Sequence, residues 1–212
     1  MPDIPVPHPV PWITQYATPG LVADIAYHGH PPADDPNWPD SGAPDQQAYG
    51  RWCTRLCGMA CLKMALTARD GHAPSLFTLL RGCLDYGGYV EEPDGRVTGL
   101  LYRPFADFTH ERCQLRSDVI TDLNPGRITR ELDQGRLVMA SVHKEIRRPE
   151  HDPPATGGHL VLITGHGDGQ VSFRNPSGHI PTAGRATLPM STFDRFAAHR
   201  GISLHIQRGR RN

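Results

Sequence analysis

The sequence has no excess of charge of either sign, no long hydrophobic run and no dense set of cysteines. Basic and acidic side chains number 22 each, which gives a formal net charge of zero, so the basic footprint typical of nucleic-acid-binding proteins is missing. No stretch approaches the ~18 consecutive apolar residues of a membrane-spanning helix. The arginines at 208–211 are expected to be a solvated end rather than a partner site. We therefore expect neither nucleic acid nor membrane as a partner.

Cysteine usage and the first residues favour a reduced, cytoplasmic protein. The chain has five cysteines, an odd number without the spacing of a small disulfide framework. The start, MPDIPVPHPVPWITQY, lacks the basic and apolar regions of a secretory signal. Cys53, Cys57 and Cys61 are spaced by four, but no second cysteine pair follows and the histidines lack a metal-ligand spacing. No metal and no cofactor are expected.

Length and proline content suggest how the chain is organised. A chain of 212 residues fits one domain with a sizeable core, so we predict a single domain over 1–212. Prolines are concentrated in residues 1–46. That segment is predicted to be mostly extended or looped, with at most one short strand.

Hydrophobic periodicity changes from helical to strand-like along the chain. Helices are predicted from Cys57 to about residue 69, near 75–83, over 101–112 and over 126–134. Strands are predicted at 137–142, 160–164, 171–173 and 202–206, with a last helix opened by a capping-box spacing at Ser191. Helices followed by antiparallel strands indicate the α+β class.

Cys57 is the candidate nucleophile because it begins the first strong helix. No side-chain cap precedes it, so the free N–H groups and partial positive charge of the helix start favour a thiolate and can receive an oxyanion. Gly58 is expected to leave room for a substrate carbonyl. The alternative is that Cys57 is a small buried hydrophobe. Cys61, Cys83 and Cys113 are expected to be packed side chains.

The stretch GGHLVLITGHGDGQVSFRNPSG carries the candidate base and its orienting residue. A turn at 165–169 predicts a hairpin that places Asn175 opposite His159 or within a few positions of it. The Asn175 carbonyl would then accept the imidazole N–H and fix its tautomer. His143, which ends the previous strand, is the rival base, and His166 is expected to point to the other face. Asn175 could equally start a turn before the following proline.

Three motifs together resemble a known family. CGMACLKMAL, GGHLVLITGH and VSFRNPSGH resemble the C39-like peptidases, a branch of the papain-like cysteine peptidases. The resemblance implies a papain-like α+β fold with the nucleophile at the N-terminus of a helix that packs on an antiparallel sheet carrying the histidine and the asparagine. By position it assigns Cys57 as nucleophile, His159 as base and Asn175 as the residue that orients the base.

The resemblance also implies a glutamine that helps to form the oxyanion hole. The segment VPWITQY matches the family's start and ends its pattern at Gln15, which makes residues 17–50 an insertion. A glutamine six residues before the cysteine is the other arrangement, and Arg51 occupies that position. Gln15 is the preferred donor, with Arg51 or the helix N–H groups as alternatives. A long ordered insertion would suit a substrate-covering loop.

The expected function is hydrolysis of peptide or amide bonds through a thioester acyl-enzyme. An acyltransferase or cyclase in a biosynthetic pathway is the alternative, because the same residues serve water, amine or alcohol acceptors. A non-catalytic binding module that keeps the fold is a third possibility. The implied partner is a peptide or other acyl substrate.

Overall fold

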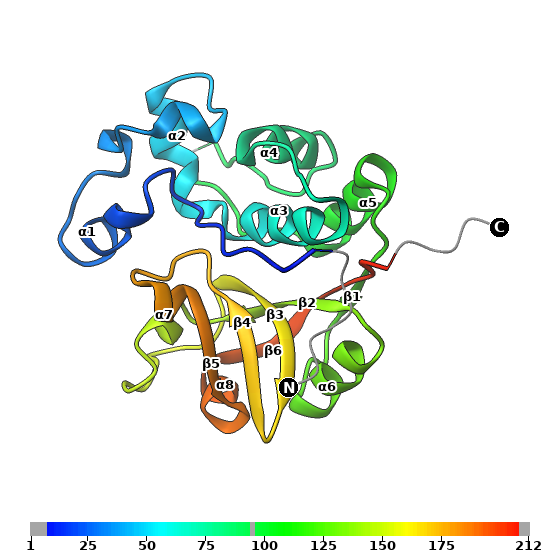
Figure 1. Ribbon diagram of the computed structural model, residues 1–212. Coiled ribbons are helices and arrows are strands. Elements are labelled where there is room, and N and C mark those ends of the chain that lie inside the picture. The colour runs from blue at the N-terminus through cyan, green and yellow to red at the C-terminus, as the bar shows by residue number, and fades with distance from the viewer. Residues whose placement is uncertain (1–7, 94–95, 208–212) are drawn as a thin grey trace.

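The computed structural model describes residues 8–93 and 96–207, which form two halves (Figure 1). One half gathers the helices α2 (Gln46–Trp52), α3 (Cys57–Asp70), α4 (Leu76–Asp85) and α5 (Tyr102–Cys113). The other half contains a sheet, around which lie α6 (Pro125–Asp133), α7 (Pro181–Gly184) and α8 (Met190–Phe196). The predicted α+β class is confirmed. None of the described helices is long and apolar enough to cross a membrane.

The sheet has six antiparallel strands in the order β1-β6-β2-β3-β4-β5. In chain order they are β1 (Ser117–Ile120), β2 (Leu137–Val142), β3 (His159–Gly167), β4 (Gln170–Arg174), β5 (Arg185–Pro189) and β6 (Ala197–Leu204). Every residue of β2 is buried, as are the first seven of β3. These central strands read as continuous apolar runs because both of their faces are covered.

Helix α3 lies where the two halves meet (Figure 1). It contacts β2, β3 and α4, and nine of its residues are buried. The helix begins at Cys57 as predicted, and Gly71, with a φ of 82°, follows its last residue as a left-handed C-cap. Burial on most sides explains why this helix lacks one clear apolar stripe.

The β3–β4 hairpin confirms the predicted turn and register. Asp168 and Gly169 both have positive φ, 50° and 72°, as a two-residue hairpin turn requires. Leu162 pairs with Arg174, so Asn175 follows next to the pair, within a few positions of His159. The hairpin therefore brings the two predicted residues to the same end of the ladder.

Residues 8–46 lie mostly outside helices and contain no strand, in agreement with the prediction, but they include short helices that were not predicted. The segment contains α1 (Val22–Tyr27) and the 3-10 helices η1 (Pro19–Leu21), η2 (Pro32–Asp34) and η3 (Trp38–Ser41). All three 3-10 helices carry proline in their first two positions. A proline ring suits a helix start, where its missing N–H costs no hydrogen bond. These prolines therefore begin helices rather than exclude them.

Other element boundaries also differ from the prediction. Helix α8 begins at Met190 and has no side-chain cap, so Ser191 lies inside its first turn and caps nothing. Strand β6 begins at Ala197, five residues before the predicted start. The short strands β1 and β5 were missed. The basic residues at 208–211 lie outside the described residues.

Candidate active site

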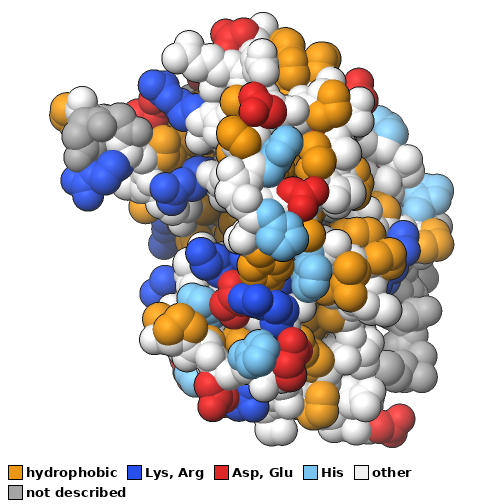
Figure 2. Space-filling view, turned by 90° about the vertical axis from the view of Figure 1, so that its left-hand side faces the viewer, with side chains coloured by type: hydrophobic (Ala, Val, Ile, Leu, Met, Phe, Trp, Pro, Cys, Tyr) orange, Lys and Arg blue, Asp and Glu red, His pale blue; other side chains and the backbone are white. Residues whose placement is uncertain are grey.

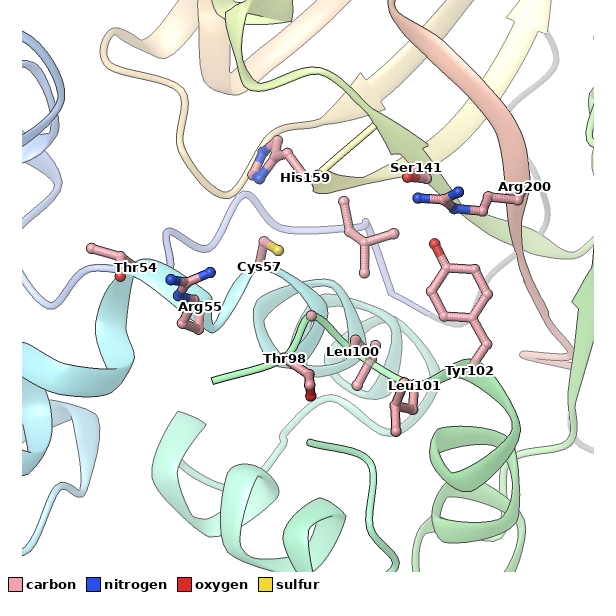
Figure 3. A pocket seen from close by; sticks show the side chains of 13 residues that line it. Thr54, Arg55, Cys57, Thr98, Leu100, Leu101, Tyr102, Ser141, His159 and Arg200 are labelled. Atoms are coloured by element: carbon pink, nitrogen blue, oxygen red, sulfur yellow. The ribbon is translucent and has the colours of Figure 1, made fainter. Parts of the chain in front are cut away.

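Cys57 is the first residue of α3 and lines a cavity. Leu56 precedes it and provides no side-chain cap, so the first-turn N–H groups have no side-chain acceptor. The cavity measures about 400 Å³. Figure 3 shows the Cys57 thiol and the His159 ring on facing walls of it. The helix start, the sulfur and the imidazole thus border one space large enough for part of a substrate.

Gly58 packs closely against two leucines. A Cβ atom at this position would lie 2.7 Å from Leu100 Cδ2 and 3.3 Å from a methyl group of Leu160. Gly58 is buried, so it permits close packing of these leucines against the helix start. Room for a substrate carbonyl at Gly58 stays a prediction.

His159 begins β3 and is held by two side chains. Its Nε2 lies 2.8 Å from Asn175 Oδ1 and 3.1 Å from Ser177 Oγ. All three residues are buried. Gly157 and Gly158 precede the histidine with φ of 79° and 86°, a left-handed conformation that favours glycine. The chain therefore enters β3 through a turn that presents the ring to the cavity.

The Asn175 contacts fix the histidine tautomer. The backbone N–H of Ser177 donates to Asn175 Oδ1 at 3.0 Å, so this atom is the amide oxygen rather than the nitrogen. An oxygen can only accept, and His159 Nε2 must therefore carry its proton toward Asn175. Nδ1 is left with the lone pair. This is the form of a histidine that can accept a proton from a thiol.

Backbone contacts hold Asn175 itself. Its carbonyl accepts from Trp12 Nε1 at 2.8 Å and from the Gly178 N–H at 3.1 Å. Its own N–H donates to the Gly184 carbonyl at 2.8 Å. The Asn175 amide Nδ2 is buried without a partner among the described residues. The asparagine is thus anchored from three segments, and its role goes beyond starting a turn.

Burial favours neutral forms of both Cys57 and His159. Burial raises the pKa of the Cys57 thiol, although N–H groups of Leu160 and Gly58 oppose the shift. Burial lowers the pKa of His159 to about 4, despite the Asn175 hydrogen bond. No hydrogen bond joins the two side chains in the described structure. Both pKa shifts indicate that, without substrate, Cys57 is a neutral thiol and His159 a neutral imidazole. They do not form the ion pair that a nucleophilic cysteine often has.

Gln15 lies close to the site, between α3 and the Asn175 loop. Its Nε2 donates to the Cys53 carbonyl at 2.9 Å, and its backbone N–H donates to the Pro176 carbonyl at 2.9 Å. One amide hydrogen remains, because a side-chain amide has two. Arg51, the alternative oxyanion donor, forms an exposed ion pair with Glu91 at 2.9 Å.

The rival residues have other contacts. His143 Nδ1 accepts from the Glu145 N–H at 3.3 Å, and His166 Nε2 lies 2.8 Å from Asp133 of α6. Cys53, Cys61 and Cys83 are fully buried and Cys113 is half-buried. The described residues that line the cavity include one cysteine, Cys57, and one histidine, His159.

Ser177 and Trp12 were missed by the sequence analysis. The motif NPSG places a serine two residues after an asparagine, a spacing at which an Asn side chain commonly bonds the backbone N–H. That signal predicts the Ser177 N–H contact but not its hydroxyl contact with His159. Nothing local to Trp12 predicts its bond to Asn175, since 163 residues separate them.

Comparisons with known proteins identify the fold. No protein-family model and no curated protein sequence matches the chain. A solved structure described as a C39-like peptidase from Bacillus anthracis matches with a TM-score of 0.54 and 14% identity, over 74% of this chain and 90% of that one. The peptidase domain of Streptococcus ComA, a bi-functional ABC transporter of a quorum sensing pathway, matches with a TM-score of 0.50 and 15% identity, over 73% and 93%.

The molecule therefore has the papain-like α+β fold of C39-like cysteine peptidases. The fold that the sequence motifs implied is confirmed. At these identities the likeness concerns the fold, and the chemistry of the site is argued from its own residues.

Proposed function

We propose that the protein is a cysteine-dependent acyl-transfer enzyme that hydrolyses peptide or amide bonds. The proposal rests on one observation. Cys57 and His159 border one cavity, and His159 is held by Asn175 in the tautomer that leaves Nδ1 free as a base. A nucleophile, a base and a residue that orients the base are the three parts that covalent catalysis by a thiol needs.

The proposed reaction has two halves. Nδ1 of His159 takes the thiol proton as Cys57 Sγ attacks the carbonyl carbon, and the oxyanion is received by the Cys57 N–H and the remaining Gln15 amide hydrogen. The C–N bond breaks while His159 returns the proton to the leaving amine, which leaves a thioester. Water then gives a proton to His159 and attacks the thioester. The S–C bond breaks, the acid leaves and the thiol is restored.

The cavity favours a substrate with negative charge. Arg55 and Arg200 line it, and none of the described acidic side chains does. Figure 3 shows Arg200 beside Ser141 and Tyr102, at the far end from Thr54 and Arg55. Apolar walls between two cationic ends would suit an acyl group with an acidic side chain.

The test is selective labelling followed by turnover. Iodoacetamide labelling mapped over the five cysteines should modify Cys57 first, because it lines the cavity. Incubation with acidic and basic peptide amides should then give a covalent adduct on Cys57, with faster turnover of the acidic set. Cys57→Ala and His159→Ala should abolish turnover, and Cys113→Ala, the other half-buried cysteine, should not.

Added amine distinguishes hydrolysis from acyl transfer. Free acid as the main product supports the hydrolase, and amide product formed at low amine concentration supports the acyltransferase. Labelling of Cys113 before Cys57, with no adduct from any peptide, would refute both and favour a binding module.

A further inference from the structure

A second cavity lies beside η5 (Lys144–Arg147), which follows β2. It measures about 400 Å³ and is lined by Arg147, Arg148 and His179 together with apolar side chains such as Ile180 and Leu188. It shares no lining residue with the cavity at Cys57. Figure 2 views the molecule from the side of α1 and α7, and basic and histidine side chains gather on the middle and lower part of this face.

The charged side chains around this cavity are unevenly buried. Glu145 is the carboxylate that both arginines contact: Arg148 Nε lies 2.9 Å from its Oε2, and Arg147 Nη2 lies 3.5 Å from its Oε1. The side chain of Arg147 is only 5% exposed, against 17% for Glu145 and 40% for Arg148. Glu150 also lines the cavity, but its side chain is 62% exposed and is therefore screened by water. The buried guanidinium of Arg147 thus shares the nearby Glu145 carboxylate with Arg148, and a closer counter-ion would stabilise it.

Two buried polar atoms of residues that line this cavity, Arg147 Nε and His179 Nδ1, have no partner within the described structure. The same is true of the hydroxyl of Tyr27, whose ring contacts these residues although it does not itself line the cavity. Buried polar groups in folded proteins are normally hydrogen-bonded. All three can donate, the histidine in one of its neutral tautomers.

Ring contacts bring these groups together from three segments of the chain. The guanidinium carbons of Arg147 and Arg148 lie 4.8 and 4.1 Å from the centre of the Tyr27 ring. His179 packs edge-on against the same ring, with 5.6 Å between the ring centres. Tyr27 belongs to α1, so the insertion completes the cluster. We call Tyr27, Arg147, Arg148 and His179 the arginine cluster.

We propose that the arginine cluster binds a small oxyanion, the carboxylate or phosphate group of a ligand. Such a group supplies the closer counter-ion for Arg147 and accepts from the unpartnered donors, and a guanidinium can bind it through two parallel hydrogen bonds. The site goes beyond the proposed function, because it lies outside the cavity that holds Cys57. It therefore stands whether or not the protein is a hydrolase.

The test is calorimetric titration of the full chain with inorganic phosphate and, separately, with acetate, at constant ionic strength. Saturable binding is expected, and Arg148→Gln should weaken it at least tenfold, since it removes one guanidinium that is 40% exposed and should leave the fold intact. Arg116→Gln, an exposed arginine beside Asp118 on β1, is the matched control and should bind normally. Tighter phosphate binding indicates a phosphate-bearing ligand, and acetate of equal or greater affinity indicates a carboxylate.

A second variant keeps the test independent of folding. Tyr27→Phe removes only the hydroxyl and should weaken binding several-fold, with an unchanged circular dichroism spectrum. Absence of saturable binding of both anions at millimolar concentration would overturn the proposal. Equal weakening in Arg148→Gln and Arg116→Gln would do so too, because it would show a general charge effect.

Discussion

His159 is a titratable residue that folding places in a buried position, and its pKa is lowered to about 4 chiefly by burial. In the unfolded chain a histidine titrates near 6.5. The unfolded state therefore binds a proton first as pH falls, so the native state loses stability between about pH 6.5 and 4. Below about pH 4 the loss in the free energy of unfolding reaches roughly 3 kcal/mol, because each unit of pKa difference is worth about 1.4 kcal/mol.

Chemical denaturation at several pH values measures this loss. His159→Gln should remove about 3 kcal/mol of the difference between the free energy of unfolding at pH 7 and at pH 4. An identical pH dependence in the wild type and in His159→Gln would contradict a buried neutral His159.

The state of Cys57 is a second residue-scale prediction. Burial raises the pKa of this thiol, so its alkylation rate should keep rising with pH above ~8.5, the ordinary value for cysteine. A preformed ion pair would instead give a plateau from low pH. The rate of iodoacetamide labelling at Cys57 between pH 5 and 10 separates the two, and a plateau below pH 7 would refute the neutral pair.

Ser177 is a positioning residue whose hydroxyl contacts His159 Nε2 at 3.1 Å. Ser177→Ala keeps the backbone N–H that holds Asn175, so we expect kcat to fall about three- to tenfold with KM unchanged, since the contact is worth about 1 kcal/mol. Asn175→Ala removes the acceptor itself and should cost much more. Ser177→Thr should restore most of the rate if the hydroxyl matters, whereas a merely structural role predicts a change in melting temperature and none in kcat.

The sequence allowed Cys57, His159 and Asn175 to be placed together, because a helix start and a tight hairpin are local signals. The protonation states could not be predicted from it. They depend on burial, which raises the pKa of Cys57 and lowers that of His159, and this burial arises from contacts between segments that are distant in sequence.

At the scale of elements, long helices and central strands were predictable because their periodicity is strong. The helix from Cys57 and strands β2 and β3 began within a residue of the prediction. Edge strand β5 alternates between exposed and half-buried residues and has no apolar run. The four short helices of residues 19–41 have no strong periodicity of their own and are stabilised by tertiary contacts. Their sequence therefore resembles that of a loop.

The loop between β4 and β5 packs against the N-terminal segment with almost no spare space. A Cβ at Gly184 would lie 2.1 Å from Trp12 Cε2. Gly184→Ala should therefore displace Trp12 from the Asn175 carbonyl and lower stability by about 1–3 kcal/mol, with a loss of activity. Gly20→Ala, where an added Cβ meets nothing within 4 Å, is the matched control. Thermal unfolding of both variants checks this, and equal melting temperatures would contradict the packing argument.

At the scale of the whole molecule, residues 17–50 connect the two halves. Tyr49 of α2 packs on Phe77 of α4 with 6.4 Å between ring centres, and Tyr27 of α1 packs on Arg148 of the sheet half. The same segment leads into Cys53, whose carbonyl holds Gln15. Residues 17–50 thus contact both halves, and their role as an inserted, substrate-covering loop stays a prediction.

Asp35 is the residue that holds this segment together. It is fully buried and accepts from the Thr18 N–H at 2.9 Å, the Tyr49 hydroxyl at 2.6 Å and the Asn37 N–H at 3.1 Å. Burial alone would raise its pKa, but these hydrogen bonds outweigh burial and lower it. The carboxylate is therefore charged at neutral pH and fully used as an acceptor.

Asp35→Ala leaves the buried Tyr49 hydroxyl and two part-buried backbone N–H groups without this acceptor, which should cost roughly 3 kcal/mol. Because Tyr49 also receives the Ala17 N–H at 2.9 Å, the loss should spread to Gln15 and the start of α3. Hydrogen exchange should accelerate over residues 15–53 while the central strands stay protected, and turnover should fall in parallel. Asp34→Ala, an exposed neighbour, should change neither. Faster exchange confined to residues 30–40, with full activity, would show that the insertion is independent of the site.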